Sequence, residues 1–315
     1  MHFSQYYNAP MLLNPANTGL MSDYDYRVGA NFRNQWASLP VPYKTFSAYA
    51  DFQAFRMHNE TNWMGAGLAF YNDKAGNGDL SLTRIEGFVA YHIEIGTTSM
   101  ISGGLSGAYV QRSVDFAKLT FNDQWDGVVF NSTMANNEKP GEVKTNYLDV
   151  SAGLNYAWFP NENVYIKLGA GISHINQPKE SFYGMVNQMG IRPTGNLDAL
   201  LKLSNTVTLN PSVYYTNEKV ASQLVYGTLF SINMGGDLRL GENLLLGAYH
   251  RYGDAVIATA GIDWGGFRTM FSYDVTASKL SSYNGSNGAF EVGIRWQGSY
   301  GDRGAERKVY NCPRF

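Results

Sequence analysis

The sequence predicts an all-β protein, a transmembrane antiparallel β-barrel of about fourteen strands with a plug-like N-terminal segment. Three observations point to this class. Apolar and polar residues alternate with a period of two along most of the chain. Short polar turns alternate with longer connectors. Charged residues make up only 16% of the chain, against roughly a quarter in typical soluble domains.

The alternation is clearest at the first predicted strand. Tyr26, Val28, Ala30 and Phe32 are separated by arginine, glycine and asparagine. Such a period of two puts apolar residues on one face of a strand and polar residues on the other. No segment predicts a helix. The same pattern recurs over residues 46–52, 85–93, 148–156, 164–170, 197–201, 207–209, 224–232, 244–248, 256–262, 271–275 and 290–296.

The connectors predict which end of each hairpin faces which side. Six short polar turns alternate with seven connectors of more varied length. Outer-membrane barrels have this asymmetry, with tight periplasmic turns and longer extracellular loops. An even number of strands also returns both ends of the chain to the periplasmic side. The short turns lie at residues 58–61, 96–98, 161–163, 204–206, 241–243 and 265–266, and the longer connectors include 111–143, 176–193 and 277–288.

Charged residues of the predicted strands fall on the parity opposite to the apolar residues. On a lipid-facing surface, an arginine or lysine would cost about 2–4 kcal/mol at mid-membrane. Inside a barrel the two signs can pair, and their mixture argues against a strongly selective ion pore. We expect a salt-bridged lumen built from Arg27, Arg33, Arg84, Glu86, Asp149 and Arg295, together with Asp51, Lys167, Asp198, Lys202, Arg251, Arg268, Asp274 and Glu291.

A soluble β-sandwich or soluble barrel is the alternative fold, because it also alternates. It would usually carry more lysine and glutamate on its wet face. Long strands, uniform hairpin order and low charge favour the membrane form. Tryptophans near the predicted strand ends are expected to form interfacial girdles, although ordinary sheet packing is a second explanation: Trp36, Trp63, Trp158, Trp264 and Trp296.

Several classes of function lack support in the sequence. The net charge of −2 argues against a nucleic-acid partner. The five histidines are scattered without metal-ligand spacing, and no local signature links serine, histidine and aspartate as a triad. The acidic stretch 122–127 lacks the spacing of a calcium loop. We therefore expect no catalytic, cofactor or metal site, and an enzyme is the weakest class.

The opening stretch, FSQYYNAPMLLNPANTG, is aromatic and contains two prolines. It cannot join a sheet comfortably, and disordered tails are usually poor in aromatic residues. We predict three parts of the chain: a plug or periplasmic segment at 1–23, the barrel at 24–299 and a periplasmic tail at 300–315. The segment is expected to fold into the lumen or across its periplasmic mouth, and a free tail is the alternative. No charged-then-apolar leader precedes His2, so we expect the signal peptide to have been removed.

The opening motif, the following stretch YRVGANFRNQW and the final CPRF resemble the PorP/SprF family of Bacteroidetes outer-membrane proteins. That family belongs to the type IX secretion and gliding-motility system. The resemblance implies an outer-membrane barrel that is not an enzyme and needs no cofactor. It also implies a role beside a secreted adhesin with a type B C-terminal domain and a periplasmic peptidoglycan-binding lipoprotein. The residues that carry it are Phe3, Gln5, Tyr6, Pro10, Asn14, Pro15, Ala16, Gly19, Cys312, Pro313, Arg314 and Phe315.

Taken together, these observations predict a plugged barrel that helps export the adhesin or anchors it at the cell surface. Long loops on a rigid scaffold concentrate binding residues, so the two longest connectors are expected to bind the cargo. The periplasmic ends, 1–20 and 301–315, would face the secretion or cell-wall machinery. A channel or small-molecule transporter is the main alternative, and a soluble ligand-binding β-domain is a third. The candidate cargo-binding residues are Asn122, Asp123, Trp125, Asp126, Phe182, Tyr183 and Met185.

Overall fold

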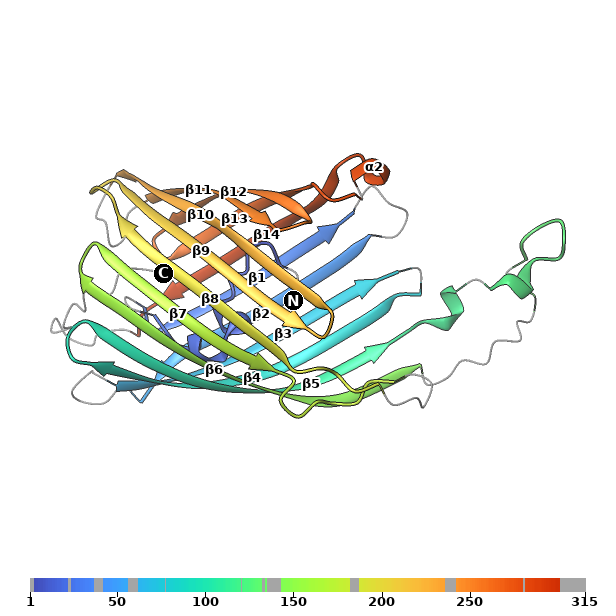
Figure 1. Ribbon diagram of the computed structural model, residues 1–315, viewed down its shortest axis with the longest axis horizontal. Coiled ribbons are helices and arrows are strands. Elements are labelled where there is room, and N and C mark those ends of the chain that lie inside the picture. The colour runs from blue at the N-terminus through green and yellow to red at the C-terminus, as the bar shows by residue number, and fades with distance from the viewer. Residues whose placement is uncertain are drawn as a thin grey trace.

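The computed structural model describes residues 3–21, 24–36, 42–55, 62–76, 78–119, 121–131, 134, 143–181, 187–235, 242–279 and 281–300. Its strands form one closed antiparallel barrel (Figure 1). They are β1 (Tyr26–Gln35), β2 (Tyr43–Ala54), β3 (Asn62–Ala75), β4 (Leu80–Ile95), β5 (Ser99–Ser113), β6 (Lys144–Asn161), β7 (Val164–Ser173), β8 (Arg192–Lys202), β9 (Val207–Glu218), β10 (Ala221–Gly235), β11 (Glu242–Arg251), β12 (Ala255–Trp264), β13 (Phe267–Thr276) and β14 (Asn287–Gly298).

Closure joins the first strand to the last. β1 pairs with β14 from Tyr26↔Gly298 to Gln35↔Ala289, and with β2 on its other side. Every strand therefore has two neighbours, and no strand edge is left without hydrogen-bond partners in a medium that offers none. The predicted class, a closed antiparallel barrel of about fourteen strands, is confirmed.

The two ends of the barrel differ. One end, here called the terminal end, carries the start of β1 and the end of β14, with connectors such as 162–163 and 265–266. The opposite loop end carries the connectors 114–143, 174–191 and 277–286, but also a two-residue turn at 219–220. The predicted boundaries of the long connectors were off by two or three residues, because β5 continues to Ser113 and β8 begins at Arg192.

Five short helical turns lie in the part of the chain that the structure describes, so the expectation of no helix was wrong. They are α1 (Pro10–Leu13), η1 (Pro15–Asn17), η2 (Phe116–Lys118), η3 (Asn122–Gln124) and α2 (Ser281–Asn284). None of the helices in the described ranges is long and apolar enough to cross a membrane. Each has only three or four residues, too few for the sequence periodicity to reveal.

The two faces of the wall follow the predicted parity. On β6, Leu148 and Leu154 are 66% and 63% exposed on the outer face, whereas Asp149 and Asn155 are 1% and 4% exposed on the inner face. An apolar outside and a polar inside invert the soluble arrangement and match a lipid surround. Trp158, Trp264 and Trp296 are also exposed.

Trp63 does not belong to an outer girdle, as the sequence had suggested. It is only 5% exposed, and its indole Nε1 donates a hydrogen bond to the carbonyl of Gly19 at 3.0 Å. Its place on the inward parity of β3 makes it a lumen residue that supports the N-terminal segment. Strand parity decides this more directly than proximity to a strand end does.

Candidate functional site: the N-terminal segment, the lumen pocket and the projecting loop

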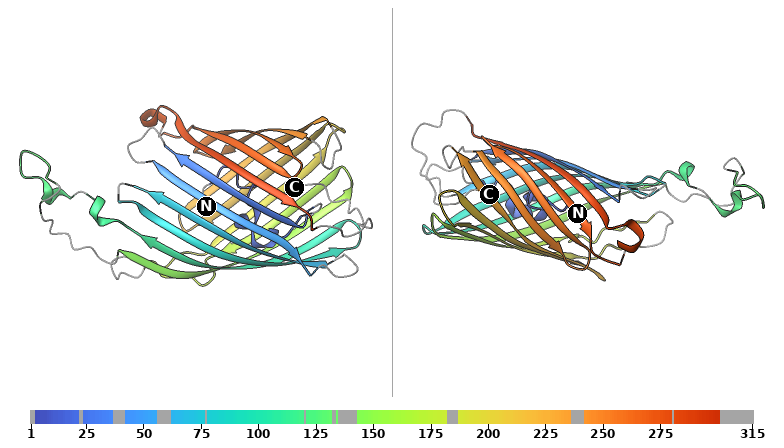
Figure 2. Two further views of the ribbon diagram at one scale, coloured as in Figure 1. Left: turned by 180° about the vertical axis from the view of Figure 1, so that it is seen from behind. Right: turned by 90° about the horizontal axis from the view of Figure 1, so that it is seen from above.

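Residues 3–21, here called the N-terminal segment, lie inside the ring of strands. Figure 2 shows this dark-blue stretch within the barrel in both views. The segment starts in the loop-end half, where Ser4 contacts β13 and β14, and descends to the terminal end, where Gln53 Nε2 donates to the carbonyl of Met21. It is not a free tail, because the side chains of residues 3–21 are buried or half-buried.

A cluster of buried charges holds the beginning of the segment. The backbone N–H of Ser4 donates to Glu291 at 2.7 Å, and its hydroxyl contacts both carboxylate oxygens of Asp274 at 2.8 Å. Arg33 and Arg251 each donate to the Ser4 hydroxyl and to Asp274. All four charged side chains are almost completely buried. Two arginines and two carboxylates therefore balance one another around one serine.

Aromatic side chains hold the next part of the segment. The Tyr6 hydroxyl lies 2.6 Å from the hydroxyl of Ser212, and its ring stacks on Tyr214 with centroids 5.5 Å apart. Tyr7 stacks on Tyr249. A neutral phenol can share its proton in this hydrogen bond. These rings fill space that a fourteen-strand wall alone would leave open.

The two prolines of the opening motif each start a helical turn, at positions where a missing N–H does no harm. Pro10 begins α1 and Pro15 begins η1. Between them, Asn14 accepts from the backbone N–H of Ala16 at 2.9 Å and donates to Asn155 of the wall at 3.0 Å. The motif therefore encodes a compact turn that also reaches the barrel wall.

The end of the segment is fixed in the terminal-end half of the lumen. His92 Nε2 contacts the Thr18 carbonyl at 2.8 Å, and because a carbonyl can only accept, Nε2 carries the proton. Gly19 has a positive φ of 66°, and its N–H donates to Asp51 at 2.8 Å. Asp51 in turn binds Arg27 through two hydrogen bonds of 2.9 and 2.6 Å.

Inward-facing glycines let the segment approach the wall. A β-carbon on Gly65 would lie 1.9 Å from the Thr18 carbonyl oxygen, and one on Gly104 would lie 2.4 Å from the Pro15 carbonyl carbon. On Gly153 it would lie 1.8 Å from Asn14 Oδ1. Sequence reasoning missed these contacts. The available signal was glycine on the polar parity of neighbouring strands.

The predicted lumen charges fall into three places. Arg33 belongs to the cluster around Ser4, whereas Arg27 and Arg295 lie in the terminal-end half. Arg84 joins Glu86 at 2.7 Å and Asp149 at 2.6 Å in the loop-end half. There His174 also contacts Asp149 at 2.9 Å. The lumen charges thus form two separate groups in the loop-end half and a third group in the terminal-end half.

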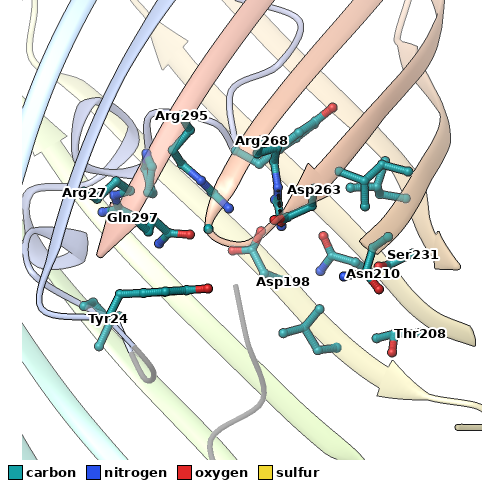
Figure 3. Close-up of a pocket in the computed structure, with 18 of the residues that line it drawn as sticks. Tyr24, Arg27, Asp198, Thr208, Asn210, Ser231, Asp263, Arg268, Arg295 and Gln297 are labelled. Carbon is teal, nitrogen blue, oxygen red and sulfur yellow. Dashed lines mark hydrogen bonds and ion pairs between the residues drawn. The ribbon is translucent and has the colours of Figure 1, made fainter. Parts of the chain in front are cut away.

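A pocket of about 280 Å³, here called the lumen pocket, lies between the N-terminal segment and strands β7 to β14 (Figure 3). Leu13 and Leu20 of the segment and Leu229 of β10 form part of its apolar side. Arg268, Arg295 and Asp263 point into it from β12 to β14, opposite Asp198, Asn210 and Ser231. Residues of the turns at 162–163 and 265–266 line it as well, which places its mouth at the terminal end.

The connector 114–143 is here called the projecting loop, and its described residues 114–119 and 121–131 extend far beyond the barrel rim as the green segment in Figures 1 and 2. Trp125 and Phe130 form an antiparallel bridge at its tip. Asp126 accepts from the N–H groups of Val128 and Val129, which lowers the pKa of its carboxyl group. The side chains of Trp125, Val128, Val129 and Phe130 are exposed.

The other candidate cargo-binding residues have mixed outcomes. Asn122 and Asp123 lie in η3, beside the tip. Phe182, Tyr183 and Met185 lie outside the described residues, as do Cys312, Pro313, Arg314 and Phe315. In the described part of the chain, no group of three or more histidine, cysteine, aspartate or glutamate side chains is placed to hold a metal ion.

A family profile, described as type IX secretion system membrane protein PorP/SprF, matches residues 1–296. The chain belongs to the PorP/SprF family. This membership confirms the resemblance carried by the opening motif, and it assigns the protein to the outer membrane and to type IX secretion. It links the protein with secretion components and their cargo in general. No curated protein matches the chain.

Solved structures similar to this PorP/SprF protein share its fold. The toluene transporter TbuX of Ralstonia pickettii has a TM-score of 0.57 at 10% identity, covering 93% of this chain and 94% of its own. The toluene transporter TodX of Pseudomonas putida has a TM-score of 0.52 at 8% identity, with 91% of both chains covered. A FadL homologue of Pseudomonas aeruginosa has a TM-score of 0.53 at 7% identity, covering 92% and 94%. At these identities the likeness shows the fold alone.

Proposed function

We propose that this barrel helps export a large secreted type IX adhesin with a type B C-terminal domain, or anchors it at the cell surface. The projecting loop is the proposed cargo-binding element. In outer-membrane barrels the short turns face the periplasm, so the loop end faces outward. The exposed apolar tip of the projecting loop is the observation that carries the proposal.

The chemistry of the tip supports a binding role. Val128 is 79% exposed, and Trp125 and Val129 are each 56% exposed, although the tip stands in water far from the lipid-facing wall. Contiguous apolar side chains in water mark interaction sites, and tryptophan is enriched among residues that dominate binding energy. The bridge from Trp125 to Phe130 and the Asp126 hydrogen bonds hold the tip in one shape before binding.

The base of the projecting loop is attached to the neighbouring hairpin. Asp115 N–H donates to the carbonyl of Gly78, and Lys118 pairs with Asp79. These contacts tie the loop to the β3–β4 turn, so that it projects from a defined point of the rim. A loop held in this way could present its tip to a large cargo outside the membrane.

We also propose that the N-terminal segment acts as a plug. Its contacts extend from the Ser4 cluster to Gly19 and cross much of the height of the lumen. A closed lumen suits an anchoring protein, which needs a rigid wall and no pore. In this scheme the periplasmic side, with the tail at 300–315, would face secretion components and a peptidoglycan-binding lipoprotein.

The cargo proposal is tested at the tip. Replacing Trp125, Val128, Val129 and Phe130 together by serine should release the adhesin into the medium while the barrel still inserts. Immunoblots of cells, medium and outer-membrane fractions measure both. Replacing residues 115–142 by a short glycine-serine linker should have the same effect. This deletion leaves β5 and β6 intact, because they end at Ser113 and begin at Lys144.

A matched control uses exposed apolar residues of other turns at the loop end. Val220 and Tyr252 are 103% and 72% exposed, and serine at both positions should leave surface adhesin unchanged. Undiminished surface adhesin in the tip variant would reject the projecting loop as the binding element.

A channel or small-molecule transporter is the second candidate. It is favoured by the likeness to proteins described as toluene transporters and by the lumen pocket. The discriminating measurement is conductance of the purified protein in planar bilayers. A plugged anchor should conduct hardly at all and should open when residues 3–21 are deleted, whereas a channel should conduct with the segment in place.

A further inference from the structure

The outer face of the barrel carries few charges, and their signs differ between its two ends. On the outward parity of the described strands, the charged residues at the loop end are lysines, whereas the one at the terminal end is a glutamate. They are Lys44 of β2, Lys74 of β3 and Lys144 of β6 against Glu242 of β11, and all four are exposed. Positive charge on the outward parity of these strands therefore belongs to one rim.

Two of these lysines are direct neighbours. Lys44 is the cross-strand partner of Lys74 in the antiparallel pairing of β2 with β3, and the two are here called the lysine pair. Residues so placed have Cβ atoms about 4.5–5.5 Å apart, and like charges there destabilise a sheet. Within the described part of the chain, the lysines that pair with a carboxylate are Lys118 and Lys167. A negative group between the two ammonium groups of the lysine pair would remove their repulsion.

The connectors beside the lysine pair do not supply that negative group. Connectors 36–42 and 76–79 contain one acidic residue, Asp79, and Lys118 of the projecting loop pairs with it. Lys118 holds the pKa of the Asp79 carboxyl group below its usual value, and the lysine pair lowers that pKa further. Asp79 is therefore near the lysine pair, but its ion pair is made with another cation.

From the lysine pair toward mid-membrane, the outer face becomes apolar step by step. Two residues along the strands, Phe46 lies opposite Asn72, and two residues further, Ala48 lies opposite Phe70. Phe46 and Phe70 are 40% and 37% exposed. The face thus changes from ammonium to amide to hydrocarbon over four residues, about 13 Å along the strands. A membrane changes from headgroups to hydrocarbon in the same order, and lysine stems can lie along apolar surface while their ammonium groups stay among the headgroups.

Deeper in the membrane, the same part of the wall has a shallow apolar groove. Small residues leave the groove open between two leucines: Ala50, Ala66, Gly87 and Gly107 between Leu68 and Leu105. Ala50 lies six residues from Lys44, and Leu68 lies six residues from Lys74. Six residues are about 20 Å along a strand, or a depth of about 14 Å at a tilt of about 45°. The hydrocarbon of one leaflet is roughly 15 Å thick, so an acyl chain whose headgroup lies at the lysine pair reaches the groove.

We infer that the lysine pair binds the phosphate group of an outer-leaflet lipid whose acyl chain lies in this groove. The membrane around the barrel supplies the ligand, and the two directly opposed ammonium groups select an anionic headgroup. The loop end faces outward, because the short turns of outer-membrane barrels face the periplasm. The site is separate from the tip of the projecting loop, and its ligand does not depend on the proposed cargo.

The test uses the full-length protein in detergent, with lipid A, a phosphorylated glycolipid, as the probe and native mass spectrometry as the readout. Lys44→Gln combined with Lys74→Gln should weaken lipid A binding on the order of tenfold, because two charge-assisted contacts are lost. Lipid A stripped of its phosphates should bind the native protein and this double variant equally weakly. Lys44→Arg combined with Lys74→Arg keeps both charges and should retain binding.

Two further variants complete the test. Lys219→Gln combined with Lys279→Gln removes the same charge from exposed lysines of other loop-end connectors, and binding should be unchanged. Gly87→Leu fills the groove without a clash, since a β-carbon there meets nothing within 4 Å, and it should weaken binding with the lysine pair intact. Undiminished binding after loss of the lysine pair, or equal binding of phosphorylated and stripped lipid A, would overturn the inference. Displacement of lipid A by inorganic phosphate would also overturn it, because the site would then be one for a free anion.

Discussion

The Thr18 carbonyl oxygen lies so close to Gly65 that a β-carbon there would be 1.9 Å away. The same carbonyl accepts a hydrogen bond from His92 at 2.8 Å. The Thr18 carbonyl therefore lies against the bare backbone of Gly65 on one side and is hydrogen-bonded to the His92 side chain on the other. The wall and the segment are therefore complementary in shape and in hydrogen bonding.

A side chain at Gly65 should displace the segment. Gly65→Val is expected to destabilise the protein by about 1–3 kcal/mol, because the added side chain would collide with backbone atoms of the N-terminal segment. Hydrogen exchange of residues 14–21, followed by mass spectrometry, should become faster. Gly107→Val is the matched control, since a β-carbon there meets nothing within 4 Å. Equal exchange in the two variants would contradict the proposed close fit.

Loss of the carboxylate at Asp274 should release the beginning of the segment. Asp274→Asn leaves Arg33 and Arg251 buried beside Ser4 with one negative charge fewer. Removing one partner of a buried ion pair typically costs about 3–5 kcal/mol. Urea unfolding in lipid vesicles measures this loss. Asp115→Asn, in an exposed pair with Lys118, should change stability by less than about 0.5 kcal/mol. Similar midpoints for both variants would show that the cluster is not an anchor.

A charge on the outer face of β6 should oppose insertion. Leu154→Arg is expected to cost about 2–4 kcal/mol, because Leu154 is 63% exposed on the lipid-facing parity. Val220→Arg, in the turn at the loop end, should be neutral since that residue is fully exposed to water. Folding yields into vesicles report the difference. Normal insertion of Leu154→Arg would argue against a lipid surround at this position.

The tip of the projecting loop should depend on pH through Asp126. Hydrogen bonds from Val129 and Val128 lower the pKa of this carboxyl group from its usual value of 3.8. The stabilisation is therefore fully present above that usual value, and it is lost as the pH falls through the lowered pKa. Nuclear magnetic resonance of the Val128 and Val129 amides should show this loss. Asp126→Ala should show the unprotected state at all pH values, and pH-independent amide signals in the native protein would oppose this role.

Some features of the candidate site could be predicted from local sequence. Two prolines and a run of aromatic residues exclude a comfortable strand at residues 3–19, and the family motif lies there. The partners of that segment could not be predicted. Ser4 meets Glu291 and Asp274, some 270 to 290 positions later in the chain, and no local pattern encodes so distant a pairing. The inward placement of Trp63 was missed for a different reason. Its nearness to a strand end suggested an outer girdle, whereas its place on the inward parity of β3 puts it in the lumen.

The amino-acid order alone determined the wall: a closed barrel whose strands put Leu154 outside and Asp149 inside. It could do so because side-chain direction in a strand repeats every two residues and is a local property. Only the tertiary structure decided what fills the wall. The descent of the N-terminal segment past Gly65, Gly104 and Gly153 brings together residues that are far apart in the sequence. These contacts form only when the ring of strands closes around the segment, so they are a property of the whole chain.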